Sequence, residues 1–157
     1  MEFNDNVNYT ILASCNDKEF MSKLSMYQVI GLVGFDKLKS TLEMFPSKRV
    51  VFNEALSILS MKEKQEIFSL LEKQNISYVN VTSNVEDTLF SDIIVVYDGN
   101  LKVLEGNKEM VLKNDKVLKK AGFGTPFAVD LSIGLIYYDI LDKVYFDVNT
   151  LTEALWN

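Results

Sequence analysis

Short, unbroken runs of β-branched and aromatic residues recur along this chain, separated by segments whose apolar residues follow a helical period. These runs predict four strands, at residues 7–13, 49–52, 76–82 and 92–97. A strand that is apolar at successive positions is buried on both faces, and such strands are typical of parallel sheets. Strands that alternate with helices therefore predict an α/β fold, a small and mostly parallel sheet flanked by helices.

The segments between the runs predict helices at residues 17–33, 36–45 and 61–74, and a helical turn at 84–90. The helix predicted over residues 61–74 is amphipathic, and we expect Ile67 and Leu71 to face the core. Charged side chains of the same helix, Lys64 among them, are expected to face solvent.

The dipeptide Asp98-Gly99 predicts a tight turn, from which residues 101–104 return as a hairpin strand. Beyond this point the pattern is helical, with helices expected at 107–114, 115–121, 126–141 and 148–156. We therefore expect two units, a reduced α/β core over 1–106 and a helical extension over 107–157. Apolar residues are dense at 126–157, which predicts an interface with a protein partner or with a second copy of the chain.

Composition excludes several classes of function. The chain has 16 Lys and Arg against 22 Asp and Glu, so neither nucleic acid nor an anionic membrane surface is an expected partner. It has no histidine, which excludes imidazole bases, Ser-His and Cys-His nucleophiles and most zinc sites. Cys15 is the sole cysteine, so no intrachain disulfide is expected. We expect a cytoplasmic protein, because the first residues do not resemble a signal peptide and the apolar runs are too short to span a membrane.

The sequence SDIIVVYDGNLKVLEG at 91–106 resembles the stretch that follows the switch histidine in ABC transporter ATPases. The residues that keep that family's spacing are Asp92, Asp98, Val103, Glu105 and Gly106. Residues 107–126 and the final LTEALWN resemble the C-terminal extension of one subgroup, the ATPases of energy-coupling-factor importers of cobalt, biotin and other vitamins. In that subgroup the extension helps to pair two ATPase subunits, so the resemblance implies that residues 107–157 are a dimerisation unit.

The resemblance continues towards the N-terminus. Residues 42–60 resemble the Walker B strand and the turn after it, with Asn-Glu-Ala where the family has Asp-Glu-Pro. Residues 12–24 align with the Walker A loop, and the run Val-Thr-Ser-Asn lacks the family's switch histidine. The resemblance implies vestigial nucleotide-binding positions at Lys18, Asn53 and Ser83, and a vestigial general base at Glu54.

Departures from the family's pattern argue against nucleotide chemistry. Leu12 and Asp17 replace the two Walker A glycines, so that a side chain crowds the phosphates and a carboxylate repels them. Glu19 replaces the hydroxyl residue that would hold Mg²⁺. Only 35 residues separate Lys18 from Asn53 (53 − 18), too few for the helical subdomain with its Leu-Ser-Gly-Gly-Gln signature, and that signature occurs nowhere in the chain.

We therefore expect a truncated, degenerate member of that family that binds no ATP, Mg²⁺ or other cofactor. It would be a non-hydrolysing structural or regulatory partner of an importer ATPase, peripheral to a membrane transporter subunit. Two alternatives stay open: weak ATP binding or hydrolysis through Lys18 and Glu54, and a small α/β protein-interaction domain unrelated to transport. A reactive thiol at Cys15, and a metal site formed by Asp17, Glu19, Asn53 and Glu54, are minor alternatives, and no metal is expected.

Overall fold

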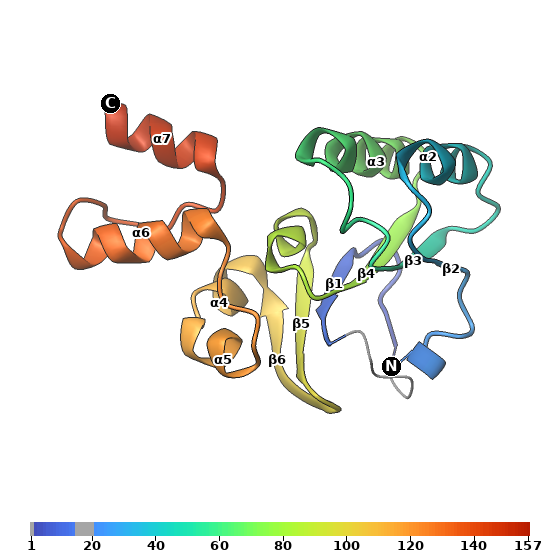
Figure 1. The fold of residues 1–157 in the computed structure, drawn as a ribbon, viewed down its shortest axis with the longest axis horizontal. Helices are drawn as coiled ribbons and strands as arrows, with labels where there is room; N and C mark the ends of the chain where they lie inside the picture. Colours follow the sequence, from blue (N-terminus) through green and yellow to red (C-terminus); the bar gives the residue numbers. More distant parts are fainter. Residues whose placement is uncertain (1, 15–20) are drawn as a thin grey trace.

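A computed structural model describes residues 2–14 and 21–157 of the chain. Its centre is a six-stranded sheet in the order β2-β3-β4-β1-β5-β6 (Figure 1). The strands are β1 (Tyr9–Leu12), β2 (Val29–Ile30), β3 (Arg49–Asn53), β4 (Ser77–Thr82), β5 (Ile93–Asp98) and β6 (Leu101–Asn107). Neighbouring strands pair in parallel except β5 and β6, which form an antiparallel hairpin. The mostly parallel α/β sheet predicted from the sequence is thus confirmed.

Helices lie on the sheet and beyond its β6 edge (Figure 1). They are α2 (Phe35–Glu43), α3 (Met61–Lys73), the 3-10 helix η1 (Val85–Phe90), α4 (Lys108–Leu112), α5 (Asp115–Lys120), α6 (Phe127–Tyr137) and α7 (Val148–Trp156). Of the helices in residues 2–14 and 21–157, none combines the length and the apolar character that crossing a bilayer requires.

The path of the chain puts β1 at a point where the order of the strands reverses. From β1 the chain runs to the edge strand β2 and returns through β3 to β4, which is the neighbour of β1 on that side. It then passes through η1 to β5, on the other side of β1. Open α/β sheets bind their ligands outside the carboxyl ends of the strands at such a reversal, so this edge is where a site is expected.

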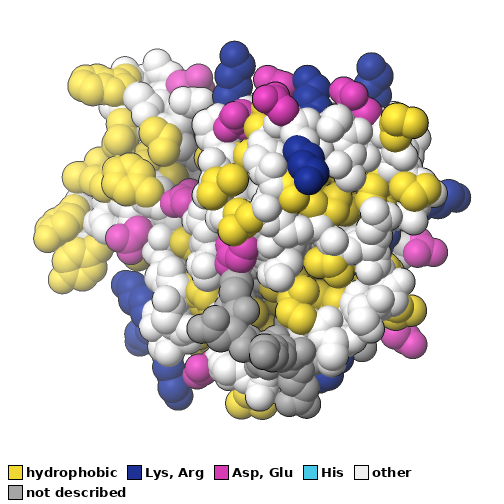
Figure 2. All heavy atoms as spheres, turned by 45° about the vertical axis from the view of Figure 1, so that its right-hand side comes forward, with side chains coloured by type: hydrophobic (Ala, Val, Ile, Leu, Met, Phe, Trp, Pro, Cys, Tyr) yellow, Lys and Arg dark blue, Asp and Glu magenta, His cyan; other side chains and the backbone are white. Residues whose placement is uncertain are grey.

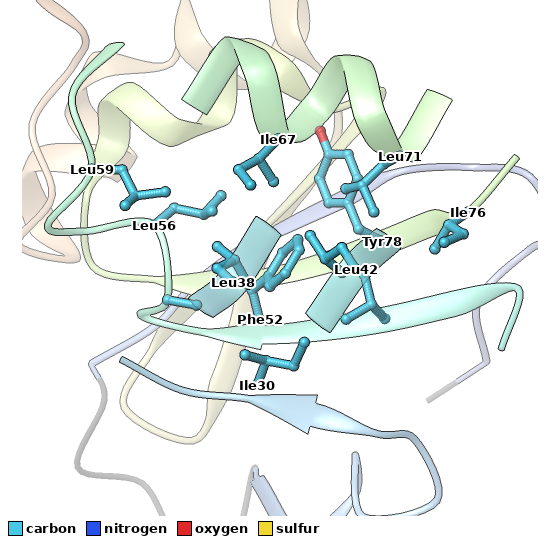
Figure 3. Packing of buried hydrophobic residues seen from close by; sticks show 12 residues of the cluster. Ile30, Leu38, Leu42, Phe52, Leu56, Leu59, Ile67, Leu71, Ile76 and Tyr78 are labelled. Carbon is cyan, nitrogen blue, oxygen red and sulfur yellow. The ribbon is translucent and has the colours of Figure 1, made fainter. Parts of the chain in front are cut away.

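One half of a sheet face is covered by α2 and α3, which bury a continuous apolar core (Figure 3). The sheet contributes Phe52 and Tyr78, and the helices contribute Leu38, Leu42, Ile67 and Leu71. Each fully buried Leu, Ile or Phe contributes about 1.5–3 kcal/mol relative to an exposed one. α3 begins at Met61 because Ser60 and Glu63 form a reciprocal capping box, which satisfies backbone N–H groups at the helix start.

The other half of the same face is covered by the helices that follow β6. Leu12, Ile94 and Val96 point to this side and pack with apolar residues of α4, α5 and α6. The opposite face carries Ile11, Val79 and Val95, against which the N-terminal segment and the segment from residue 21 to residue 27 pack. Both faces are therefore covered, as the unbroken apolar runs predict.

The prediction of a helix over residues 17–33 is wrong in its second half, where the chain forms β2. Residues 15–20 lie outside the described part of the chain. Leu24 N–H donates to the Met21 carbonyl at 3.1 Å, a three-residue turn that ends the helical run before the chain enters β2. Ile30 is buried in β2, where it adds to the core beneath α2. Its spacing fits a helix as well as a strand, and pairing with β3 decides for the strand.

The C-terminal region differs from expectation mainly at its boundaries. β6 extends to Asn107, whose side chain caps α4, so a continuous strand-to-helix turn stands where the two units were expected to divide. α6 ends at Tyr137 instead of 141, and Asp139 follows it with a left-handed φ of 57°. The division of the chain into a core and an extension remains a prediction.

Candidate functional site

The carboxyl ends of β1, β3 and β4 meet at one edge of the sheet. Asn53 ends β3 and pairs with Val81 of β4, and Ala13 N–H, just after β1, donates to the Thr82 carbonyl at 3.2 Å. Glu54 follows directly on β3, and Ser83 follows directly on β4. The structure thus brings together Asn53, Glu54 and Ser83.

The fourth residue singled out from the sequence, Lys18, lies outside the described residues. The same holds for Cys15, Asp17 and Glu19, so the reactive thiol and the metal site weighed above remain untested. Among the residues that the structure describes, no group of three or more Cys, Asp or Glu side chains is arranged to hold a metal ion.

Glu54 adopts an uncommon backbone conformation at this edge. Its φ is 54°, in the left-handed region, which costs a residue with a Cβ roughly 1–2 kcal/mol. The turn directs Glu54 N–H to the Val81 carbonyl at 2.9 Å, so the main chain bends across the end of β4. Strain of this kind persists only where surrounding contacts hold it.

The carboxylate of Glu54 supplies such contacts. Oε1 accepts a hydrogen bond from Ser83 N–H at 2.7 Å, and Oε2 lies 3.3 Å from the hydroxyl of Thr82. The side chain therefore ties the end of β3 to the turn after β4. Hydrogen bonds to an ionised acceptor are worth about 1.5–3 kcal/mol each, enough to offset the backbone strain.

The same hydroxyl connects Glu54 to a buried ion pair. Thr82 Oγ1 lies 3.2 Å from Asp87 Oδ2, and Asp87 Oδ1 accepts from Lys64 Nζ at 2.6 Å. The Lys64 and Asp87 side chains are only 7% and 1% exposed. A hydroxyl has one proton, so Thr82 donates to Glu54 or to Asp87 but not to both at once, while it accepts from Asn84 N–H at 3.0 Å.

The expectation that Lys64 faces solvent is therefore wrong. Lys64, Ile67 and Leu71 share one helical stripe, at spacings of three and four residues, and that stripe faces the core. The ammonium is buried because Asp87, on η1, compensates its charge. The spacing was the signal that could have revealed this pair, although nothing in the sequence identified Asp87 as the partner.

A second feature is an apolar surface on residues 126–157, here called the C-terminal hairpin. α6 and α7 pack on each other, and Val129 and Leu151 are buried. Many of its large apolar side chains are nevertheless exposed: Phe127, Leu131, Tyr137, Tyr138, Ile140, Val148, Leu155 and Trp156. Figure 2 shows hydrophobic side chains gathered over this part of the molecule. Exposed apolar patches of this kind mark interaction surfaces.

Comparison with known proteins gives sequence relatives and a structural neighbour. No protein-family model matches the chain. The energy-coupling factor transporter ATP-binding protein EcfA1 of Clostridioides difficile is 28% identical over 112 residues, which are 69% of this chain and 40% of that protein. EcfA1 of Mycoplasmoides gallisepticum is 26% identical over 132 residues, or 80% of this chain and 47% of that protein. The chain thus spans less than half of the length of these curated relatives.

Among solved structures, CbiO1 of Clostridium perfringens, part of the ABC transporter complex CbiONQ, matches with a TM-score of 0.51. The match covers 88% of each chain at 12% identity, which shows a shared fold. These relatives confirm the resemblance drawn from the sequence. In sequence, the chain is similar to the ATP-binding proteins of energy-coupling factor transporters, and in fold it is similar to CbiO1, a part of the ABC transporter complex CbiONQ.

Proposed function

We propose that this protein is a non-hydrolysing relative of the ABC-transporter ATP-binding subunits, and that it serves as a structural or regulatory partner of an importer ATPase. The similarity to energy-coupling factor ATP-binding proteins supports the transporter context. The lack of histidine, the replaced Walker A glycines and the missing signature support the loss of hydrolysis. In this proposal the chain keeps part of the family's fold, while most of the residues that would contact nucleotide are replaced.

The observation that carries the proposal is the engagement of Glu54. A general base for hydrolysis must present its carboxylate to a water next to the γ-phosphate. Here Oε1 accepts from Ser83 N–H at 2.7 Å, and the residue after β4 that would be the switch histidine is this same serine. With the carboxylate bound to the turn and no imidazole available, the edge offers a structural contact in place of a catalytic pair.

The C-terminal hairpin is the surface through which we propose that the protein associates. Its exposed apolar side chains make it suited to a protein partner, an ATPase subunit or a membrane subunit of the importer. In this proposal, residues 1–106 form the reduced core and residues 107–157 the pairing unit. The core then serves as the scaffold that positions the hairpin.

Isothermal titration calorimetry with Mg-ATP tests the loss of nucleotide binding, with EcfA1 of Clostridioides difficile as the positive control. We expect no heat of binding at micromolar nucleotide for this protein and a normal isotherm for the control. Binding at micromolar affinity would contradict the proposal.

Measuring phosphate release by the unchanged protein and by two variants distinguishes residual ATP hydrolysis by this chain from hydrolysis by a contaminating enzyme. The variants Lys18→Ala and Glu54→Gln are expected to release phosphate at the same background rate as the unchanged protein. If both variants abolish a rate that the unchanged protein shows, the chain is an ATPase that uses these two residues, and the proposal is wrong.

A further inference from the structure

A groove separates the core from the start of the C-terminal hairpin. It has a volume of about 370 Å³ and lies between the start of α3, η1 and the segment that joins α6 to α7. Its apolar lining includes Met61, Phe90, Phe146 and Val148, and the charged side chains among its described lining residues are Glu86 and Asp147. Among the residues that the structure describes, none that lines the groove is Lys or Arg. We call it the acidic groove.

Hydrogen bonds hold both carboxylates of the acidic groove in place. Glu86 Oε1 accepts from Phe127 N–H, the first residue of α6, at 2.8 Å. Asp147 caps α7 by accepting from Thr150 N–H at 3.0 Å, and Thr150 Oγ1 donates to its second oxygen at 2.6 Å. These bonds also hold the pKa of Asp147 below its usual range, so it is ionised at neutral pH.

The groove therefore presents fixed negative charge beside apolar surface. A helix N-terminus carries about half a positive charge, which offsets only part of the charge of the carboxylate that caps it. Large apolar side chains of the hairpin that do not line the groove are also exposed: Phe127 is 62% exposed and Trp156 is 84% exposed. Apolar side chains flanked by anionic ones match a segment that is apolar on one side and cationic at its edges.

The charge of the hairpin argues against a second copy of the chain as the occupant. Residues 126–157 contain five acidic side chains and a single basic one, Lys143. Pairing two such surfaces would bring like charges together in a partly desolvated interface, which disfavours the complex. A partner with Lys or Arg beside its apolar residues would neutralise the same charges.

We infer that the acidic groove and the adjoining face of the C-terminal hairpin bind a basic amphipathic helix of a different protein. Its large apolar side chains enter the groove, and its Lys or Arg side chains lie opposite Glu86 and Asp147. This is helix-in-groove recognition, with charge setting the choice of partner. The inference rests on the proposed function in one respect, that the hairpin is the surface of association. It adds the chemistry of the partner segment, a basic amphipathic helix.

Fluorescence anisotropy of the full-length protein with two labelled peptides tests the inference. The probe is an amphipathic Leu/Lys helix of about 18 residues, and its counterpart carries Glu at every Lys position. We expect the Leu/Lys peptide to bind at least about tenfold more tightly. Trp156 is the sole tryptophan of the chain and lies on α7, so binding is also expected to shift its emission to shorter wavelength.

A double variant isolates the groove from the overall negative charge of the protein. Glu86→Gln with Asp147→Asn removes both charges but keeps amide oxygens that accept the Phe127 and Thr150 hydrogen bonds. We expect it to weaken the Leu/Lys peptide about tenfold, and to reduce the loss of affinity between about 50 and about 300 mM salt. The matched control, Glu72→Gln with Asp98→Asn, removes two carboxylates that do not line the groove and is expected to leave binding unchanged.

Equal binding of the two peptides, or an equal loss in the groove variant and the control, overturns the inference. So does sedimentation velocity that finds a stable homodimer which Trp156→Ser dissociates, because the surface is then occupied by a second copy. Nucleotide binding has no part in these measurements. If Mg-ATP binds, the proposed function is wrong, but the peptide-binding result still holds. If the Leu/Lys peptide does not bind selectively, only the inferred partner chemistry is wrong.

Discussion

Replacement of Lys64 by methionine removes one half of the buried ion pair while nearly keeping the volume of the side chain. Lys64 Nζ lies 2.6 Å from Asp87 Oδ1, and the two side chains are 7% and 1% exposed. The substitution leaves the Asp87 carboxylate buried without its counter-charge, with the hydroxyl of Thr82 as its remaining hydrogen-bond donor among the described residues. Breaking a buried pair in this way costs about 3–5 kcal/mol, so we expect the free energy of unfolding to fall by that amount.

Urea denaturation followed by far-UV circular dichroism measures the change. The double variant Lys64→Met/Asp87→Leu removes both charges and is expected to lie within about 1 kcal/mol of the unchanged protein, or above it. Lys113→Met is the control, because it breaks an ion pair with Glu109 of the same 2.6 Å length in which both side chains are largely exposed. It is expected to have no measurable effect. A loss below about 1 kcal/mol for Lys64→Met, or a similar loss in the control, would refute the reasoning.

Three further changes test other contacts by the same assay. Thr10 has a fully buried hydroxyl without a hydrogen-bond partner among the described residues, so Thr10→Val is expected to raise the free energy of unfolding by about 1 kcal/mol, and a decrease would contradict this. Asn75, two residues beyond the end of α3, has a φ of 54°, so Asn75→Val is expected to lower the free energy of unfolding by about 1–2 kcal/mol, and Asn75→Gly to leave it unchanged or raise it. Hydrogen bonds from Thr150 lower the pKa of Asp147, so its cap is fully stabilising above the ordinary value of 3.8 and is lost as pH falls through the lowered pKa. At pH 7 the unchanged protein is expected to be about 1 kcal/mol more stable than Asp147→Ala, and this difference should vanish as the pH falls through the lowered pKa of Asp147. A difference that grows in acid would show that Asp147 does not stabilise α7 in this way.

Four of the strands could be predicted from the sequence because side chains that are apolar at successive positions must be buried on both faces of a sheet. The strand predicted over residues 49–52 and the observed β3 (Arg49–Asn53) differ by one residue. The helix predicted over residues 17–33 could not be corrected in the same way. Ile30 satisfies both periods, and only a neighbouring strand, placed by the rest of the fold, makes its extended conformation favourable.

The candidate site was predictable in position but not in its contacts. Parallel strands bring their carboxyl ends to one edge, so Asn53, Glu54 and Ser83 had to lie close together once the strands were placed. The bond from Ser83 N–H to Glu54 depends on a left-handed residue that is not glycine, a conformation that local preferences disfavour. Long-range partners such as Asp87 for Lys64 are equally absent from local patterns, because they are 23 residues apart and meet only when η1 packs beside α3.

The sequence resemblance aligns Glu54 with a family's general base, which invites a catalytic interpretation. The contacts at this edge supply another reason for its presence. Glu54 holds the turn after β4 through Ser83 N–H and reaches the buried Lys64–Asp87 pair through Thr82. Replacing it with a residue that cannot accept hydrogen bonds would leave Ser83 N–H without this partner and keep the strain of a φ of 54°. A carboxylate at this position therefore has a role in holding the fold, so its presence does not by itself indicate ATP hydrolysis.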